Sequence, residues 1–325
     1  MKSMHYINPR TLPLIVTTAL FILLFGFGAI SYDAFLSPQV FINLIIDNGF
    51  LLVVAIGMTF VILSGGIDLS VGSVVALTTM VTASLAEHHH WSIWAITPLV
   101  LLIGCGFGLL HGVLIQVFRL QPFIVTLGGM FLARGLCYVI SIDSISITNA
   151  AYTALSEYRL PLGEETFISL SGIIALVILA IAIYIAHYTR FGRTVYAIGG
   201  NERSAMLMGL PVASTKILVY VLSGFCSALG GILVTLYMLS GYGLHAIGFE
   251  MDAIAAVVIG GTLLTGGVGN VAGTLVGVLI LGVIQSLIAF DGSLSSWWTR
   301  IAIGLLLFMF CLLQRLLERS SFGKK

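Results

Sequence analysis

Ten long apolar stretches fill most of this sequence, and they restrict the chain to very few architectures. A helix crosses the hydrocarbon core of a bilayer with roughly 20 consecutive apolar residues. The stretches lie near residues 12–30, 41–63, 71–86, 93–118, 121–141, 168–187, 215–239, 251–264, 271–289 and 297–317. The eighth is the shortest and follows two acidic residues, Glu250 and Asp252. We therefore expect an all-α, polytopic membrane protein with about ten transmembrane helices.

Composition supports a membrane location and excludes several other classes. Only 8% of the 325 residues are charged, against about 25% in an ordinary soluble domain. The formal net charge of +1 leaves no basic surface for nucleic acid. The four cysteines lie in apolar runs without metal-ligand spacing, so we expect no metal and no cofactor. One transmembrane domain over residues 1–325 accounts for the whole pattern.

The distribution of lysine and arginine predicts the orientation. With the N-terminus in the cytoplasm, 11 of the 14 basic residues fall on inner connections. They are Lys2, Arg10, Arg119, Arg190, Arg193, Arg203, Lys216, Arg315, Arg319, Lys324 and Lys325. Because inner loops are enriched in basic residues, we expect both termini on the cytoplasmic side of the membrane.

Glycine is arranged in two ways that suggest close helix packing or a transport route. Residues 56–73 and 259–274 form a weak repeat in which glycine-rich turns separate two spans. Such interruptions at matching positions often mark the route in transporters, but two ordinary tight turns explain them equally well. Glycines also recur every fourth residue over 104–112 and 269–277. Such stripes let helices approach closely, either inside the subunit or between subunits.

Motifs for catalysis and nucleotide binding are missing from the sequence. Residues 267–272 match G-x-G-x-x-A, but no strand–helix–strand unit surrounds them, which excludes a dinucleotide site. No phosphate-binding G-x-x-x-x-G-K-[ST] loop occurs, so this chain cannot hold ATP by itself. The three histidines at 88–90 fit a solvated loop better than a metal site. We expect no enzyme activity in this chain.

Arg134 lies deep in the fifth apolar stretch, where a charge is expensive. An arginine at the bilayer centre costs about 3 kcal/mol on insertion scales. It therefore needs a protein or water environment and a partner, and Asp47 and Asp68 are the acids within or near the membrane. A structural ion pair is at least as good an interpretation as a role in transport. Proton coupling through these acids would instead indicate a secondary transporter.

The basic segment at about 188–214 contains signals for a short helix outside the membrane. Asn201 suits the N-cap, Glu202 the first turn and Gly209 the C′ position. A helix of about eight residues is marginal by itself in water, and Met206 and Leu210 are expected to share one apolar face. A soluble protein docked on the cytoplasmic side would cover that face; the lipid surface is the alternative partner.

Three further groups of residues carry a resemblance to a known family. They are 64–73 (SGGIDLSVGS), 122–128 (PFIVTLG) followed by Arg134-Gly135, and Gly200-Asn201 with Ala205 and Gly209. Over nearly its whole length the chain resembles the permease subunits of ATP-binding-cassette (ABC) importers for ribose, galactose and other monosaccharides, a family related to branched-chain amino-acid permeases. Among the members, the chain looks most like the galactofuranose permease subunit that pairs with a non-identical sister permease.

The resemblance implies a location, partners and sites. It places the chain in a bacterial cytoplasmic (inner) membrane, with a periplasmic sugar-binding protein outside, an ABC ATPase inside and a second, non-identical permease beside it. A coupling helix would contact the ATPase through Gly200, Asn201, Glu202, Ala205, Met206, Gly209 and Leu210. A route for a neutral sugar needs hydroxyl groups and few charges, and the tentative lining residues are Thr59, Ser64, Asp68, Ser70 and Ser73. A proton-coupled secondary transporter, or an ABC permease for ribose or a branched-chain amino acid, remains the alternative.

Overall fold

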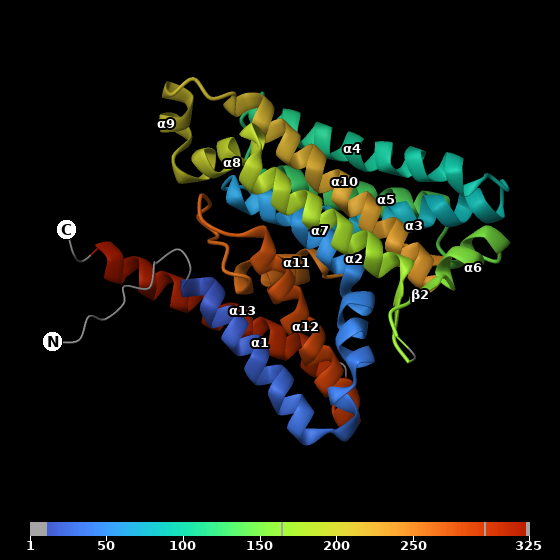
Figure 1. The fold of residues 1–325 in the computed structure, drawn as a ribbon. Coiled ribbons are helices and arrows are strands. Elements are labelled where there is room, and N and C mark those ends of the chain that lie inside the picture. Colours follow the sequence, from blue (N-terminus) through green and yellow to red (C-terminus); the bar gives the residue numbers. More distant parts are fainter. Residues whose placement is uncertain (1–11, 164, 296, 323–325) are drawn as a thin grey trace.

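The computed structural model describes residues 12–163, 165–295 and 297–322, and helices dominate this part of the chain (Figure 1). The helices are α1 (Leu12–Ser31), the 3-10 helix η1 (Asp33–Leu36), α2 (Pro38–Leu63), α3 (Val71–Glu87), α4 (Ile93–Gln116), α5 (Pro122–Ile140), α6 (Ala150–Ser156), α7 (Leu170–Tyr188), α8 (Arg190–Gly200), α9 (Glu202–Leu207), α10 (Val212–Met238), α11 (Phe249–Ile259), α12 (Val271–Asp291) and α13 (Trp297–Phe322). The short strands are β1 (Ile145–Ser146), β2 (Arg159–Pro161), β3 (Phe167–Ser169) and β4 (Ser240–Gly241).

Every apolar stretch expected to span the membrane coincides with a helix. Within the described residues, six helices are long and apolar enough to cross a bilayer: α2, α4, α5, α7, α10 and α12. The apolar parts of α1, α3 and α13 are shorter, and α11 has only 11 residues. At 1.5 Å per residue α11 is about 16 Å long, roughly half of the ~30 Å hydrocarbon core. The chain is an all-α polytopic membrane protein, and the count of ten crossings stays a prediction.

Helices α2 and α10 form the centre of the molecule. The most apolar 18-residue window of α2 is 83% buried and that of α10 67%, whereas the windows of α4, α5 and α7 are only 28% buried. Figure 1 shows α1, α12 and α13 gathered on one side of α2, with α4, α5 and α10 on the other. The outer helices therefore turn large apolar side chains such as Phe131 and Leu102 outward, as a lipid-facing surface requires.

Both glycine stripes pack helices together within the subunit. A Cβ on Gly104 would overlap the carbonyl oxygen of Gly224, and one on Gly108 would overlap that of Tyr220, so α4 lies directly on α10. In the second stripe, a Cβ on Gly277 would overlap the carbonyl oxygen of Ala256, which brings α12 against α11. The interpretation that these stripes serve packing inside the subunit is confirmed.

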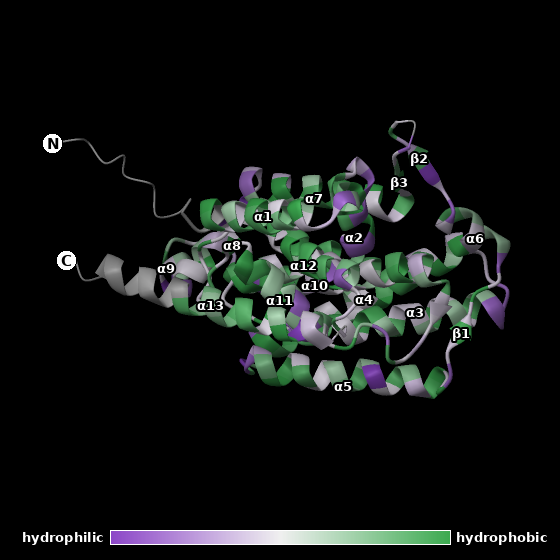
Figure 2. Cartoon of the chain, turned by 90° about the horizontal axis from the view of Figure 1, so that it is seen from below, coloured by the Kyte–Doolittle hydropathy of each residue, from purple (hydrophilic) through white to green (hydrophobic). Residues whose placement is uncertain are grey.

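The two ends of the molecule carry different structures. Helices α8 and α9 lie at one end, which we name the coupling end, while α6 and β2 lie at the other (Figure 1). Helix α1 begins and α13 ends toward the coupling end; residues 1–11 and 323–325 are outside the described part of the chain. Hydrophobic colouring follows the long helices, and hydrophilic colouring is concentrated in the connections (Figure 2).

Antiparallel strand pairs at the opposite end were not expected from the sequence. Strands β2 and β3 form a hairpin in which Leu160 faces Ile168. Strand β1 pairs with β4, with Ile145 opposite Gly241. The second pair connects the segment after α5 to the segment before α11, two parts of the chain that lie almost one hundred residues apart.

Candidate coupling face and transport route

Helix α8 directly precedes α9 and supports it, and the sequence analysis did not predict this helix. Its N-cap is Thr189, whose hydroxyl oxygen accepts a hydrogen bond from the amide of Gly192 at 3.1 Å. Val195 and Ile198 on one face are buried. Phe191, Val195 and Ile198 follow the i, i+4, i+7 spacing of an amphipathic helix, and this signal could have revealed α8 in the sequence.

Helix α9 has the caps that the sequence predicts. The Asn201 side chain accepts a hydrogen bond from the amide of Ser204 at 2.9 Å. The helix ends at Leu207, and Gly209 takes the left-handed conformation with φ of +76°. The amide of Leu210 then donates to the carbonyl oxygen of Ala205 at 3.2 Å, a bond typical of glycine-terminated helices. The helix is six residues long, slightly shorter than expected.

The exposed apolar surface of α9 differs from the expected face. Met206, Leu207 and Met208 are 58%, 88% and 67% exposed. Leu210 packs instead against Ile198, Ala205 and Val212 in a small cluster, so it does not share one exposed face with Met206. Ala205 is fully buried there, which makes it a support for α9 and not a residue a partner could touch. We call Met206, Leu207 and Met208 the coupling face.

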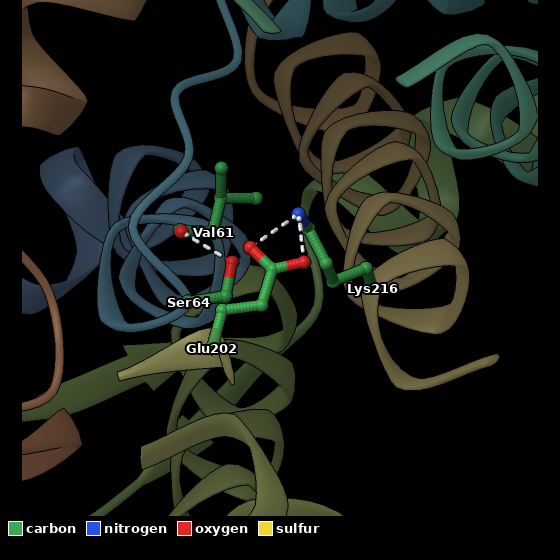
Figure 3. A network of polar contacts seen from close by, with 4 residues as sticks. All are labelled: Val61, Ser64, Glu202 and Lys216. Atoms are coloured by element: carbon green, nitrogen blue, oxygen red, sulfur yellow. Dashed lines mark hydrogen bonds and ion pairs between the residues drawn. The ribbon is translucent and has the colours of Figure 1, made fainter. Parts of the chain in front are cut away.

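Glu202 forms an ion pair with a lysine of the same subunit. Both of its carboxylate oxygens accept hydrogen bonds from the ammonium group of Lys216, at 3.0 and 3.1 Å (Figure 3). Lys216 lies in the first two turns of α10, so the ion pair connects α9 to α10. Because Lys216 is only 20% exposed, this contact is partly shielded from solvent. Glu202 therefore orients α9, and its charge is already balanced within the chain.

Two glycine-rich turns meet the end of α8 beneath α9. The amide of Gly267 donates to the carbonyl oxygen of Leu63 at 2.9 Å. A Cβ on Gly266 would lie 2.9 Å from the nitrogen of Gly65 and 3.2 Å from the Cα of Gly199. A Cβ on Gly199 would overlap the Leu63 carbonyl oxygen. We call Gly65, Gly199, Gly266 and Gly267 the glycine junction; it joins the end of α8 to both repeated turns.

A side-chain contact reinforces this junction. The hydroxyl of Tyr196 on α8 donates to the carbonyl oxygen of Gly269 at 3.0 Å. The repeated segments 56–73 and 259–274 therefore lie against each other and against α8, although the sequence alone left ordinary turns as an equal possibility. No side chain separates the backbones of these two turns from the end of α8.

The five residues expected to line the route are buried within the subunit. Thr59, Ser64, Asp68, Ser70 and Ser73 are 0%, 8%, 1%, 2% and 0% exposed. Thr59 donates to the Ala55 carbonyl oxygen at 2.7 Å, and its hydroxyl also pairs with that of Thr274 at 2.7 Å. Ser64 donates to the Val61 carbonyl oxygen at 2.8 Å (Figure 3). In this conformation their polar groups serve helix packing, and a role in the route stays a prediction.

Asp68 connects the turn after α2 to helix α10 through hydrogen bonds. One carboxylate oxygen accepts hydrogen bonds from the Ser70 amide at 3.0 Å and the Ser70 hydroxyl at 2.6 Å. The other accepts from the Ser223 hydroxyl on α10 at 2.7 Å. Three hydrogen bonds satisfy much of this buried carboxylate, as a buried polar group requires.

Arg134 binds backbone carbonyls and neither of the acids proposed for it. Its Nη1 donates to the carbonyl oxygens of Gly243 and His245, at 2.6 and 2.8 Å. Asp47 accepts a hydrogen bond from the Tyr237 hydroxyl at 3.2 Å instead. The described residues contain no ion pair to Arg134. Arg134 thus fixes the segment between β4 and α11, and the expectation that Asp47 or Asp68 pairs with it is wrong.

The histidines at 88–90 lie between α3 and α4 at the end opposite α9. His89 Nδ1 lies 3.3 Å from the Ser84 carbonyl oxygen. Among the described residues no group of three or more His, Cys, Asp or Glu side chains is arranged to hold a metal ion.

Two features together define the class of this protein. A bundle of apolar helices surrounds α2 and α10. The capped helix α9, with its exposed apolar face, follows α8, whose end lies against the glycine turns after α2 and between α11 and α12. A polytopic helical bundle of this kind suits a membrane permease. Residues 40–311 match the family described as branched-chain amino acid transport system / permease component. The chain belongs to this family, as the resemblance predicted.

The curated relatives include permeases named for sugars. The chain is 50% identical over 308 residues to the inner membrane ABC transporter permease protein YjfF of Escherichia coli K12, covering 94% of this chain and 92% of that one. It is 38% identical to the fructose import permease protein FruG of Bifidobacterium longum, covering 100% and 96%. It is 40% identical to the ribose import permease protein RbsC of Haemophilus influenzae, covering 82% of both. No solved structure matches the chain.

Proposed function

We propose that this chain is the transmembrane permease subunit of an ABC importer that carries a monosaccharide into a bacterial cell. The coupling face is the observation that carries the proposal. Three adjacent apolar side chains at the end of a six-residue helix outside the bundle are costly to leave in water. The preceding helix α8 ends on the glycine junction, which includes the turns between α2 and α3 and between α11 and α12. A docked ATPase would both cover the face and move the turns.

The remaining partners follow from the same assignment. We infer a cytoplasmic ABC ATPase at the coupling end and a periplasmic sugar-binding protein at the end with α6 and the β2–β3 hairpin. We also infer a second, non-identical permease, which the resemblance to galactofuranose permeases favours. We also propose ten membrane crossings in one domain over residues 1–325, with both termini in the cytoplasm. The sugar is galactofuranose or a similar monosaccharide, in keeping with relatives named for ribose and fructose.

Docking is tested by placing a charge on the coupling face. Leu207→Glu should abolish copurification of the ATPase with the permease, because a carboxylate would have to be desolvated in an apolar contact. Leu162→Glu is the matched control, since Leu162 is also an exposed leucine (57%) and lies at the opposite end. Equal recovery of the ATPase with both variants would remove the coupling face from the interface.

The energy source separates this proposal from proton-coupled transport. Sugar uptake by proteoliposomes that contain the complex should require ATP inside and stop with vanadate. A protonophore should leave the initial rate unchanged. Uptake that continues with vanadate and collapses with the protonophore would contradict the ABC assignment and favour a secondary transporter.

A further inference from the structure

A cavity with mixed polar lining opens in the half of the bundle away from the coupling end. It has a volume of about 650 Å³, within the range of roughly 300–1,000 Å³ for small-molecule sites. Its polar lining residues are Asp252 on α11, Gln285 on α12, and Thr299 and Arg300 on α13, and Trp297 provides an aromatic side chain. Three separate helices thus contribute to one cavity.

The depth of the cavity follows from the length of α11. This helix ends near the glycine junction at the coupling end and extends about 16 Å from it, so its first turn lies near the middle of a ~30 Å core. Asp252 belongs to that first turn. A polar cavity that begins at mid-membrane beside a half-length helix is the arrangement found at solute sites of transporters.

The polar groups of this cavity are available to a ligand. Within the described part of the chain, the side chains of Asp252, Gln285 and Thr299 form no hydrogen bond or ion pair with protein atoms. The Arg300 guanidinium lies 5.6 Å from the centre of the Trp297 ring. Asp252 and Arg300 bring two ionisable side chains into this cavity of a membrane-spanning bundle, and Trp297 beside them is 69% exposed. Ionisable side chains in such a place usually belong to a functional site.

We propose that this cavity, the Trp297 cavity, is the point where the translocated sugar contacts the permease. The inference rests on the proposed function. Asp252 and the Gln285 carbonyl oxygen would accept hydrogen bonds from sugar hydroxyls, while Arg300 and the Gln285 amide would donate to sugar oxygens. The Trp297 ring would cover an apolar face of the sugar ring. An acceptor, donors and an aromatic surface together suit a neutral polyhydroxylated ligand better than an ion or an apolar one.

The test compares two neighbouring tryptophans. Trp297→Leu removes the aromatic surface of the cavity, whereas Trp298→Leu changes an exposed tryptophan that does not line it. The full chain, assembled with its ATPase and binding protein in proteoliposomes, is supplied with radiolabelled galactose, ribose, fructose or arabinose. We expect Trp297→Leu to lower the sugar imported per ATP hydrolysed by on the order of five- to tenfold, with Trp298→Leu near the wild type.

A second variant protects the test against misfolding. Thr299→Val keeps the shape of the side chain and removes one hydroxyl, so the chain should assemble normally and still lose import per ATP severalfold. A purely structural role would lower import and ATP hydrolysis together. If both Trp297→Leu and Thr299→Val import with wild-type efficiency, the sugar does not use this cavity. If the wild type itself imports none of the four sugars with ATP, the proposed function fails first.

Discussion

The amide of Gly267 donates a hydrogen bond to the carbonyl oxygen of Leu63 across 2.9 Å, and this bond joins the turn that follows α2 to the turn that precedes α12. Gly199, the penultimate residue of α8, lies against both partners. The coupling segment is therefore in backbone contact with two interrupted helices at once. Tight packing of this kind transmits displacement, because interiors close-packed to crystal density cannot absorb it.

Gly199→Ala should uncouple the permease. The added Cβ would overlap the Leu63 carbonyl oxygen and approach the Gly267 amide, and overpacking of this type costs about 1–3 kcal/mol. We expect at least severalfold slower sugar uptake from chains that insert normally. In Gly200→Ala the Cβ meets no heavy atom within 4 Å, so its yield and thermal stability should match the wild type. Equal uptake by Gly199→Ala and the wild type would show that the junction transmits nothing.

Gly209→Val should abolish the stimulation of ATP hydrolysis by sugar-loaded binding protein. Gly209 has φ of +76°, a conformation that costs a non-glycine residue roughly 1–2 kcal/mol and a β-branched one most. The turn would re-form and displace Met206 and Leu207 from their partner. ATPase activity in lipid, with and without sugar-loaded binding protein, measures the effect. Asparagine tolerates this conformation, so Gly209→Asn should keep most of the stimulation.

Arg134→Leu should destabilise the segment before α11. The substitution leaves the carbonyl oxygens of Gly243 and His245 without their donor, at a cost of about 1–3 kcal/mol for each buried group. We expect a lower midpoint in thermal unfolding and reduced import. Arg134→Lys keeps a donor and should recover part of both. Unchanged stability of the leucine variant would mean that water replaces the guanidinium.

Single cysteines should report the orientation. In a chain whose four native cysteines have been replaced, Ser204→Cys on α9 should react with an impermeant maleimide only after the inner face is opened. Glu157→Cys, at the end with α6, should react from outside in intact cells. This expectation rests on the excess of lysine and arginine in the connections predicted to lie on the cytoplasmic side of the membrane. The reverse labelling pattern would contradict the predicted orientation and would place α9 on the side of the membrane opposite the ATPase.

Local signals in the sequence predict the helices well, but they do not predict contacts between residues far apart in the chain. Ten apolar stretches and the caps at Asn201 and Gly209 depend on neighbouring residues, and the structure has them all. The partners of Arg134 are carbonyl groups more than one hundred residues away, and a backbone acceptor leaves no mark in composition. The sequence predicts Ser70 and Thr59 as polar lining, and that role stays a prediction, because serine and threonine hydroxyls also bond to the preceding turn or to a buried carboxylate.

The enclosure of α2 has a consequence for how the protein is made. Its most apolar window is 83% buried, yet the helices that cover it, α7 and α10 to α12, are synthesised much later. At roughly 5–20 residues per second, the ribosome needs on the order of ten seconds or more after α2 to complete α10. During that interval Asn48 and Thr59 keep their hydrogen bonds to the carbonyl oxygens of Leu44 and Ala55, which belong to α2 itself. The new helix therefore needs no polar partner from the later helices, and they can pack around it as each one is inserted.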